Sequence, residues 1–150
     1  MKISLASDHN GFDLKKNIAD HIRKLGHEVL DLGPHKHDPL DDYPDYAKPL
    51  AESIANQLSD KGIMICGSGV GASVAANKIK GIRAAVCHDI YSAHQGVEHD
   101  DMNILCLGAR IIGNEVAFEL VNAFISATYS GEERHQRRLE KVLLMEKHLR

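Results

Sequence analysis

A cysteine followed directly by a glycine-rich run is the part of this sequence best suited to chemistry. Cys66 precedes Gly67-Ser68-Gly69-Val70-Gly71, and such glycines allow backbone N–H groups to surround an anion. A thiol beside these donors can serve as a general base in its thiolate form. The alternatives are a tight turn without a ligand and a cysteine buried as a small hydrophobic residue, which is our interpretation of Cys87 and Cys106.

The glycine run differs from the common nucleotide-binding motifs. No Lys-Ser or Lys-Thr pair follows at P-loop spacing, and the GxGxxG spacing of a dinucleotide site is absent. A non-catalytic nucleotide-binding module is the alternative from a different functional class, with Asp31 in the position of a ribose-binding acid. That alternative would leave Cys66 without a role.

Several charged residues are candidates for binding a phosphate or moving a proton. Arg134 and Arg138 are four residues apart, so on one helix face they could grip a single phosphate, or they could form a solvated basic face. Arg110 would add a third cation if that helix folds toward the same crevice. Among the ten histidines, His99 is the best placed for proton transfer because acidic residues flank it.

A metal site is not predicted. His35 and His37 form an HxH pattern followed by Asp38, but no further group of Cys or His supplies the remaining ligands at a known spacing.

Short apolar runs alternate with segments of helical periodicity, which is typical of a parallel sheet covered by helices. The predicted strands are 2–6, 28–31, 62–66, 83–87 and 104–107, and the helical segments are 12–25, 46–58, a helix starting near 72, 116–127 and 132–150. We expect the segment 33–44 to form an ordered surface loop.

In open parallel sheets, ligands bind beyond the carboxyl ends of the strands. The residues predicted at those positions are Asp8, His9 and Asn10, the glycine run after Cys66, His88 and Asp89, and Gly108 and Arg110. An acid, a base, a thiol and a guanidinium could therefore converge.

The segment 132–150 is highly charged and carries an apolar stripe of Leu139, Val142, Leu143 and Leu149, interrupted by Glu146. A helix with one apolar side packs against its own domain or against a second subunit. We favour the second subunit.

Composition limits the functional class. A chain of 150 residues, 43% of them hydrophobic, fits one domain spanning residues 1–150. Its net charge of -3 gives no reason to expect a nucleic-acid or membrane partner, and no apolar stretch reaches the roughly 20 residues of a membrane span. Three dispersed cysteines fit a reducing cytoplasm, the predicted location.

The motifs together resemble ribose-5-phosphate isomerase type B over essentially the whole chain. They are Ser7-Asp8-His9-Asn10-Gly11, Asp42-Tyr43-Pro44, the run Cys66 to Gly71, Ala75-Ala76-Asn77-Lys78, His99, and Arg134-His135-Gln136-x-Arg138. The resemblance implies a Rossmann-like three-layer α/β/α sandwich with a five-stranded parallel sheet and an extended C-terminal helix. It also implies homodimers, sometimes paired into tetramers, with active sites at the subunit interface.

The resemblance further implies a role for each site residue in converting a sugar phosphate without any cofactor or metal. Cys66 would move the proton from C2 to C1, while Ser68 and the N–H groups of the loop containing Gly67, Gly69 and Gly71 would stabilise the enediolate. His99, aided by Asp8, would open the sugar ring. The phosphate would be held by His9, Arg110, Arg134 and Arg138, and Tyr43 would border the sugar.

Two positions bear on the substrate. Ala72 stands where one branch of the family has a catalytic glutamate, which favours the cysteine branch. Asp100 replaces the usual Asn after the ring-opening histidine, so we count it among the substrate-binding residues and keep a six-carbon sugar phosphate, such as allose 6-phosphate, as the alternative substrate.

Overall fold

Strands and helices alternate along the chain, and a further helix follows them. The computed structural model describes residues 1–148. The strands are β1 (Lys2–Ser7), β2 (Glu28–Asp31), β3 (Lys61–Cys66), β4 (Ala84–Val86) and β5 (Ile104–Gly108). The helices are the short 3-10 helix η1 (His9–Gly11), α1 (Phe12–Lys24), α2 (Pro44–Ala55), α3 (Val70–Ala76), α4 (Ile90–Asp100), α5 (Asn114–Ser126) and α6 (Glu133–His148).

The five strands form one parallel sheet in the order β2-β1-β3-β5-β4. The chain passes from β1 to β2 on one side and then returns to β3 on the other side of β1. The strand order therefore reverses between β1 and β3, and open parallel sheets bind ligands beyond the carboxyl ends of the strands at such a reversal.

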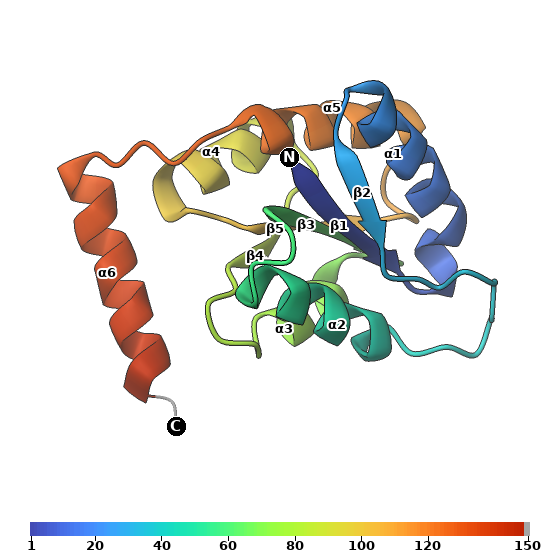
Figure 1. Cartoon of the computed structure of the whole chain (residues 1–150), viewed down its shortest axis with the longest axis horizontal. Coiled ribbons are helices and arrows are strands. Elements are labelled where there is room, and N and C mark those ends of the chain that lie inside the picture. Colours follow the sequence, from blue (N-terminus) through green and yellow to red (C-terminus); the bar gives the residue numbers. More distant parts are fainter. Residues whose placement is uncertain (149–150) are drawn as a thin grey trace.

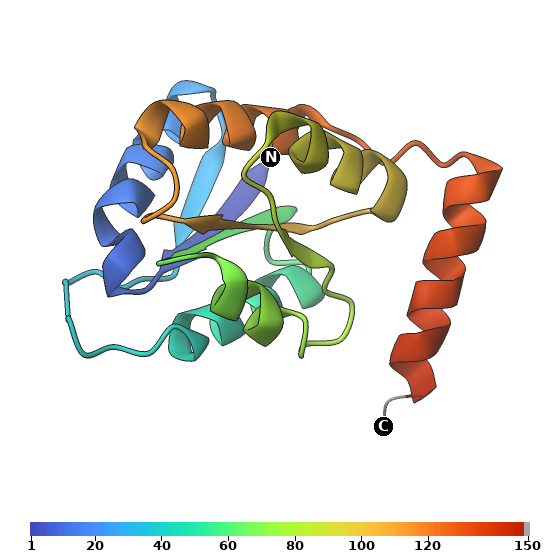
Figure 2. The same cartoon turned by 180° about the vertical axis from the view of Figure 1, so that it is seen from behind.

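Helices cover both faces of the sheet (Figures 1 and 2). Helices α1, α4 and α5 pack on one face around a core that includes Ile18, Leu105 and Phe124, whereas α2 and α3 cover the other around Leu50 and Met64. The central strands β1, β3 and β5 are almost entirely buried, as strands covered on both faces must be. The predicted three-layer Rossmann-like fold is confirmed.

The loop between β2 and α2 is anchored to the body by a buried lysine. The Nζ atom of Lys15 donates to Asp31 Oδ1 at 2.6 Å and to the carbonyl oxygen of Pro34 at 2.9 Å. Burial alone would raise the pKa of Asp31, but the hydrogen bonds from Lys15 and from the Gly33 N–H lower it. Asp31 is therefore committed to holding this loop, which leaves it poorly suited to bind a ribose.

Helix α6 extends away from the layered body, at the opposite side from the loop between β2 and α2 (Figure 1). It contacts α4, and Glu146 accepts a hydrogen bond from the backbone N–H of Gly81 at 2.6 Å. The side chains of Val142, Leu144 and Met145 are exposed by half or more. This helix therefore carries an apolar surface that the described chain leaves uncovered.

Most elements predicted from the sequence end within three residues of their observed ends. Strand β2 matches, β1, β3 and β5 are each one residue longer than predicted, and β4 is shorter. Helix α2 starts at Pro44, because proline suits the first turn of a helix, and α3 starts at Val70. Helix α4 is not predicted by periodicity, since only Ala93 and Val97 along it are buried.

Two further predictions concern the last helix and membrane spans. The predicted helix 132–150 corresponds to α6, but Leu149 and Arg150 lie outside the described residues. No helix within residues 1–148 is long and apolar enough to span a membrane.

Candidate active site

A cavity of about 330 Å³ lies where β1 and β3 end. The two strands run in register there, with Ser7 opposite Ile65, and the N–H of Asp8 donates to the Ile65 carbonyl at 3.1 Å. We call this space the cysteine cavity, and it is lined by Asp8, Asn10, Tyr43, Cys66, Gly67, Ser68, Gly71, Arg110 and Ile111. The strand-end rule thus accounts for five of the predicted site residues besides Cys66, and Tyr43 joins them from the start of α2.

The thiol of Cys66 lies against the turn that follows it. The side chain is 4% exposed, and the backbone N–H of Gly69 donates to its Sγ atom at 3.1 Å. This turn requires a φ of +83° at Gly69, which glycine adopts without steric penalty. A backbone donor is therefore fixed on the sulfur, in the position that a negatively charged sulfur requires.

The other two cysteines lack such a setting. Burial, and then the charge of Asp89, raise the pKa of Cys87 to about 11, and burial raises the pKa of Cys106 still more strongly. Both are free thiols in the interior, so the interpretation of Cys87 and Cys106 as buried hydrophobic residues is confirmed.

Asp8 connects the cavity to the start of α1. The carboxylate is nearly buried, and its Oδ1 accepts the backbone N–H groups of Asn10 and Gly11 at 2.9 and 3.2 Å. One ligand atom each from Asp8, His9 and Asp41 lie within 4.8 Å of one another. Within residues 1–148, these three side chains are close enough together to hold a metal ion, although Asp41 already accepts hydrogen bonds from His9.

Arg110 and Tyr43 form the exposed rim of the cysteine cavity. The backbone N–H of Arg110 donates to the Gly67 carbonyl at 3.0 Å, which fixes the turn after β5 against the glycine run. A Cβ atom added at Gly71 would lie 2.7 Å from the ring of Tyr43. Glycine at this position therefore lets the tyrosine ring close over the loop.

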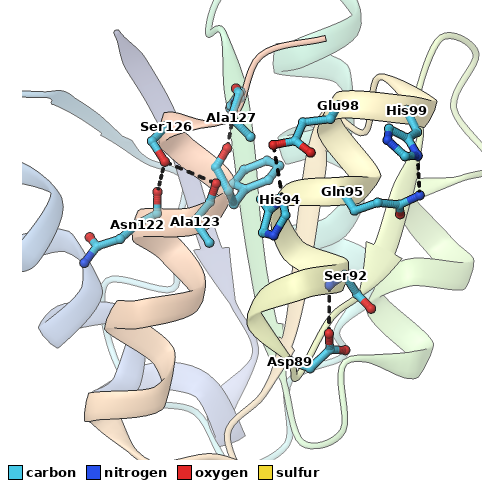
Figure 3. Close-up of polar contacts among 12 residues, drawn as sticks. Asp89, Ser92, His94, Gln95, Glu98, His99, Asn122, Ala123, Ser126 and Ala127 are labelled. Carbon is cyan, nitrogen blue, oxygen red and sulfur yellow. Dashed lines mark hydrogen bonds and ion pairs between the residues drawn. The ribbon is translucent and has the colours of Figure 1, made fainter. Parts of the chain in front are cut away.

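A second group of predicted residues lies between α4 and α6. Gln95 Nε2 lies 2.7 Å from His99 Nδ1 along α4 (Figure 3), and the His99 ring stacks on that of His135. His135 is 1% exposed, and its Nδ1 lies 2.7 Å from Ser130 Oγ. Burial, followed by the proximity of His99, lowers the pKa of His135, which favours its neutral form.

The two predicted arginines of α6 lie beside this histidine pair. Arg134 and Arg138 are exposed, and Arg134 pairs with Glu132 at 3.0 Å. Asp100 is also exposed, at the end of α4. We call this region the α4–α6 corner, defined by His99, Asp100, Arg134, His135 and Arg138.

The cysteine cavity and the α4–α6 corner lie at opposite ends of the sheet. Helix α4 starts after β4 and runs back toward the start of β5, and its 11 residues span about 16 Å. His99 therefore lies near the amino ends of the strands, whereas Cys66 lies at a carboxyl end. Among the described residues, those lining the cavity include neither His99 nor the two arginines of α6.

The structure also shows residues that sequence reasoning missed or overestimated. Asp41 pairs with His9, and nothing in the local sequence signals that contact across 32 positions. His88 accepts the N–H of Gly108 at 2.9 Å, and Asp89 caps α4 by accepting the N–H of Ser92 (Figure 3). These two strand-end residues therefore stabilise the fold, and neither lines the cysteine cavity.

A larger cavity, of about 930 Å³, lies elsewhere, near the amino ends of the strands. Its lining is mainly apolar, and the ammonium group of Lys61 already donates to the carbonyl oxygens of Phe124 and Ala127 at 2.7 and 2.8 Å. It brings together none of the predicted site residues.

Comparison with known proteins identifies relatives along almost the full chain. The sequence profile of the ribose/galactose isomerase family matches residues 3–142. The ribose-5-phosphate isomerase B of Escherichia coli is 45% identical over 145 residues, covering 97% of this chain and 96% of its own.

Solved structures agree with the sequence matches. A ribose-5-phosphate isomerase B from Clostridium thermocellum superposes with a TM-score of 0.96 at 45% identity, covering 100% of both chains. The enzyme from Mycoplasma genitalium, solved with bound ribulose-5-phosphate, gives a TM-score of 0.92 at 42% identity and covers 97% of this chain and 96% of its own.

Proposed function

Because this chain belongs to the ribose/galactose isomerase family, in its ribose-5-phosphate isomerase type B branch, we propose that it interconverts ribose 5-phosphate and ribulose 5-phosphate. The observation that carries the proposal is the Cys66 thiol, held by the Gly69 N–H in a cavity that also contains Ser68 and Arg110. A base, an oxyanion donor and a cation are the groups that proton transfer on a sugar phosphate requires.

Cys66 acts as the general base. Its thiolate takes the proton from C2 of the open-chain aldose, and the electron pair of that C–H bond forms the C1–C2 double bond while O1 becomes an oxyanion. Ser68 and the backbone N–H groups of the glycine run stabilise this enediolate. Return of the proton to C1, with transfer of the O2 proton to O1, completes the ketose.

Ring opening must precede this step, because the aldose is mostly a closed furanose. His99, aided by Asp8, takes the proton of the O1 hydroxyl and returns a proton to the ring oxygen. Asp100 lies next to His99 and contacts the sugar hydroxyls.

A second copy of the chain completes the site. Since the cysteine cavity and the α4–α6 corner are at opposite ends of one chain, Cys66 of one subunit meets His99 of the other in a homodimer. The partner also supplies Arg134 and Arg138, which join His9 and Arg110 around the phosphate. The uncovered apolar face of α6 supports this arrangement, in which the segment 132–150 packs at the interface of a dimer or of a tetramer of paired dimers.

We further propose that residues 1–150 act as one cytoplasmic isomerase domain without a cofactor or metal. The first test is conversion of ribose 5-phosphate by the purified chain in EDTA. Turnover of a six-carbon sugar phosphate but not of the pentose would show that the proposed substrate is wrong. No turnover of either sugar would refute the proposal.

Subunit mixing tests the shared site. Cys66→Ala and His99→Asn homodimers are each expected to be nearly inactive, yet a hybrid dimer retains one site with both residues intact. Random mixing should therefore restore about a quarter of wild-type activity, because half of the dimers are hybrids with one working site. Activity that stays at the level of the single variants would place Cys66 and His99 in the same subunit's site.

A further inference from the structure

Asp41 holds His9 through two hydrogen bonds on a single oxygen. Its Oδ1 lies 2.7 Å from His9 Nδ1 and accepts the His9 backbone N–H at 3.0 Å. A carboxylate can only accept, so His9 Nδ1 must carry a proton. Backbone and ring are thereby fixed together, which sets the orientation of the imidazole.

The remaining ring nitrogen is turned toward the cysteine cavity. In the neutral ring, His9 Nε2 accepts a hydrogen bond from the side-chain Nδ2 of Asn10 at 3.0 Å, and Asn10 lines the cavity. Arg110 lines the same cavity. A second N–H on the His9 ring would displace the Asn10 amide group and could then donate to a phosphate on the side of Arg110.

The charge around His9 favours the protonated ring. The hydrogen bond that the ring donates to Asp41 is the largest influence and raises the pKa of His9. Burial lowers it, the charge of Asp8 raises it and Arg110 lowers it, with a net upward shift. The ring of His37 lies edge-on with its centroid 6.5 Å away.

The environment of Asp41 leaves His9 as its main charge partner. The Asp41 side chain is 6% exposed, and its Oδ2 has no hydrogen-bond partner among residues 1–148. Burial and the nearby carboxylates raise the pKa of Tyr46, which faces Asp41, so its phenol stays neutral. A nearly buried carboxylate strongly favours a cationic neighbour.

We propose that Asp41 is a positioning residue for the phosphate group of the substrate, acting through His9: it fixes the ring and leaves Nε2–H as a donor to a phosphate oxygen. The inference deepens the proposed function and rests on it, since it takes a sugar phosphate as the ligand. Losing a charge-assisted hydrogen bond of this kind lowers affinity by about tenfold or more.

Asp41→Asn tests the proposal, with Asp45→Asn, an exposed neighbour on α2, as the matched control. The KM for ribose 5-phosphate should rise at least about tenfold in Asp41→Asn with kcat nearly unchanged, and affinity for inorganic phosphate should fall in parallel. The alkaline limb of kcat/KM should move to lower pH. In a His9→Asn background, Asp41→Asn should add no further loss, because Asp41 acts through that ring.

Nuclear magnetic resonance of the His9 ring separates this inference from the proposed function. In wild type, Nδ1 should remain protonated at alkaline pH, and the pKa of His9 should be lower in Asp41→Asn. A neutral ring that carries its one proton on Nε2 at alkaline pH in wild type, or equal phosphate affinity in wild type and Asp41→Asn, would overturn the role of Asp41 whether or not the chain is an isomerase. Weakened phosphate binding without any isomerase activity in wild type would uphold Asp41 and refute the proposed function.

Discussion

The imidazole ring of His99 stacks on that of His135, with ring centroids 3.9 Å apart and planes at 26°. Burial and then the proximity of His99 lower the pKa of His135, which favours its neutral form. The residue we propose for ring opening is therefore stacked on a neutral ring.

Replacing His99 should therefore affect closed sugars more than open ones. His99→Asn is expected to lower kcat/KM for ribose 5-phosphate by about 10²–10⁴, the usual effect of losing a positioned acid or base. Ribulose 5-phosphate cannot close a five-membered ring because its O5 carries the phosphate, so exchange of its C1 proton with solvent needs proton abstraction but no ring chemistry and should slow less. Steady-state kinetics measure the overall loss and nuclear magnetic resonance in D2O measures the exchange, and equal losses in the two would contradict a ring-opening role.

The same pair predicts how stability depends on pH. The folded pKa of His135 is lower than its unfolded value near 6.5, so its contribution to stability is complete above that pH and is lost on acidification toward the folded pKa. His135→Gln should lower Tm at pH 8 but reduce the further fall in Tm between pH 8 and pH 5.

Thermal unfolding at the two pH values tests this prediction. The exposed His35 provides the control, because His35→Gln should leave the wild-type pH dependence of Tm intact. If the Tm of His135→Gln falls as steeply as that of wild type between pH 8 and pH 5, another group causes the loss of stability in acid.

Gly71 should be needed for closure of the cavity rim. A Cβ atom at this position meets the Tyr43 ring at 2.7 Å, whereas one at Gly113 meets nothing within 4 Å. Gly71→Ala should displace the ring at a cost of about 1–3 kcal/mol and raise KM for the sugar phosphate about tenfold. Gly113→Ala should keep wild-type kinetics, and equal KM values in the two variants would exclude a role for the Tyr43 contact in binding.

Strand ends were the part of the site that could be predicted. Asp8, Cys66 and Arg110 each follow a short apolar run, and a parallel sheet brings such positions to one edge. The glycine run could be interpreted because a tight turn with a positive φ, here at Gly69, strongly favours glycine. The local sequence pattern and the general topology of parallel sheets were sufficient to predict that these residues lie together.

Contacts that depend on loops and on tertiary packing could not be predicted. Asp41 meets His9 only because the loop between β2 and α2 folds back over η1, and Lys15 anchors that loop from α1. The helix that carries His99 has a weak apolar period, since its neighbours pack on small residues such as Ala93. The separation of His99 from Cys66 follows from the direction of α4, which the sequence does not encode locally.

The most direct test of the account is the activity of Cys66→Ala beside Cys87→Ala, both assayed in EDTA with ribose 5-phosphate. Both side chains are 4% exposed, but only Cys66 receives the Gly69 N–H and lines the cavity. We predict that Cys66→Ala loses turnover by about 10²–10⁴ or more while still binding the substrate, and that Cys87→Ala remains active. Near-normal turnover by Cys66→Ala would contradict the account, because the base would then be another residue.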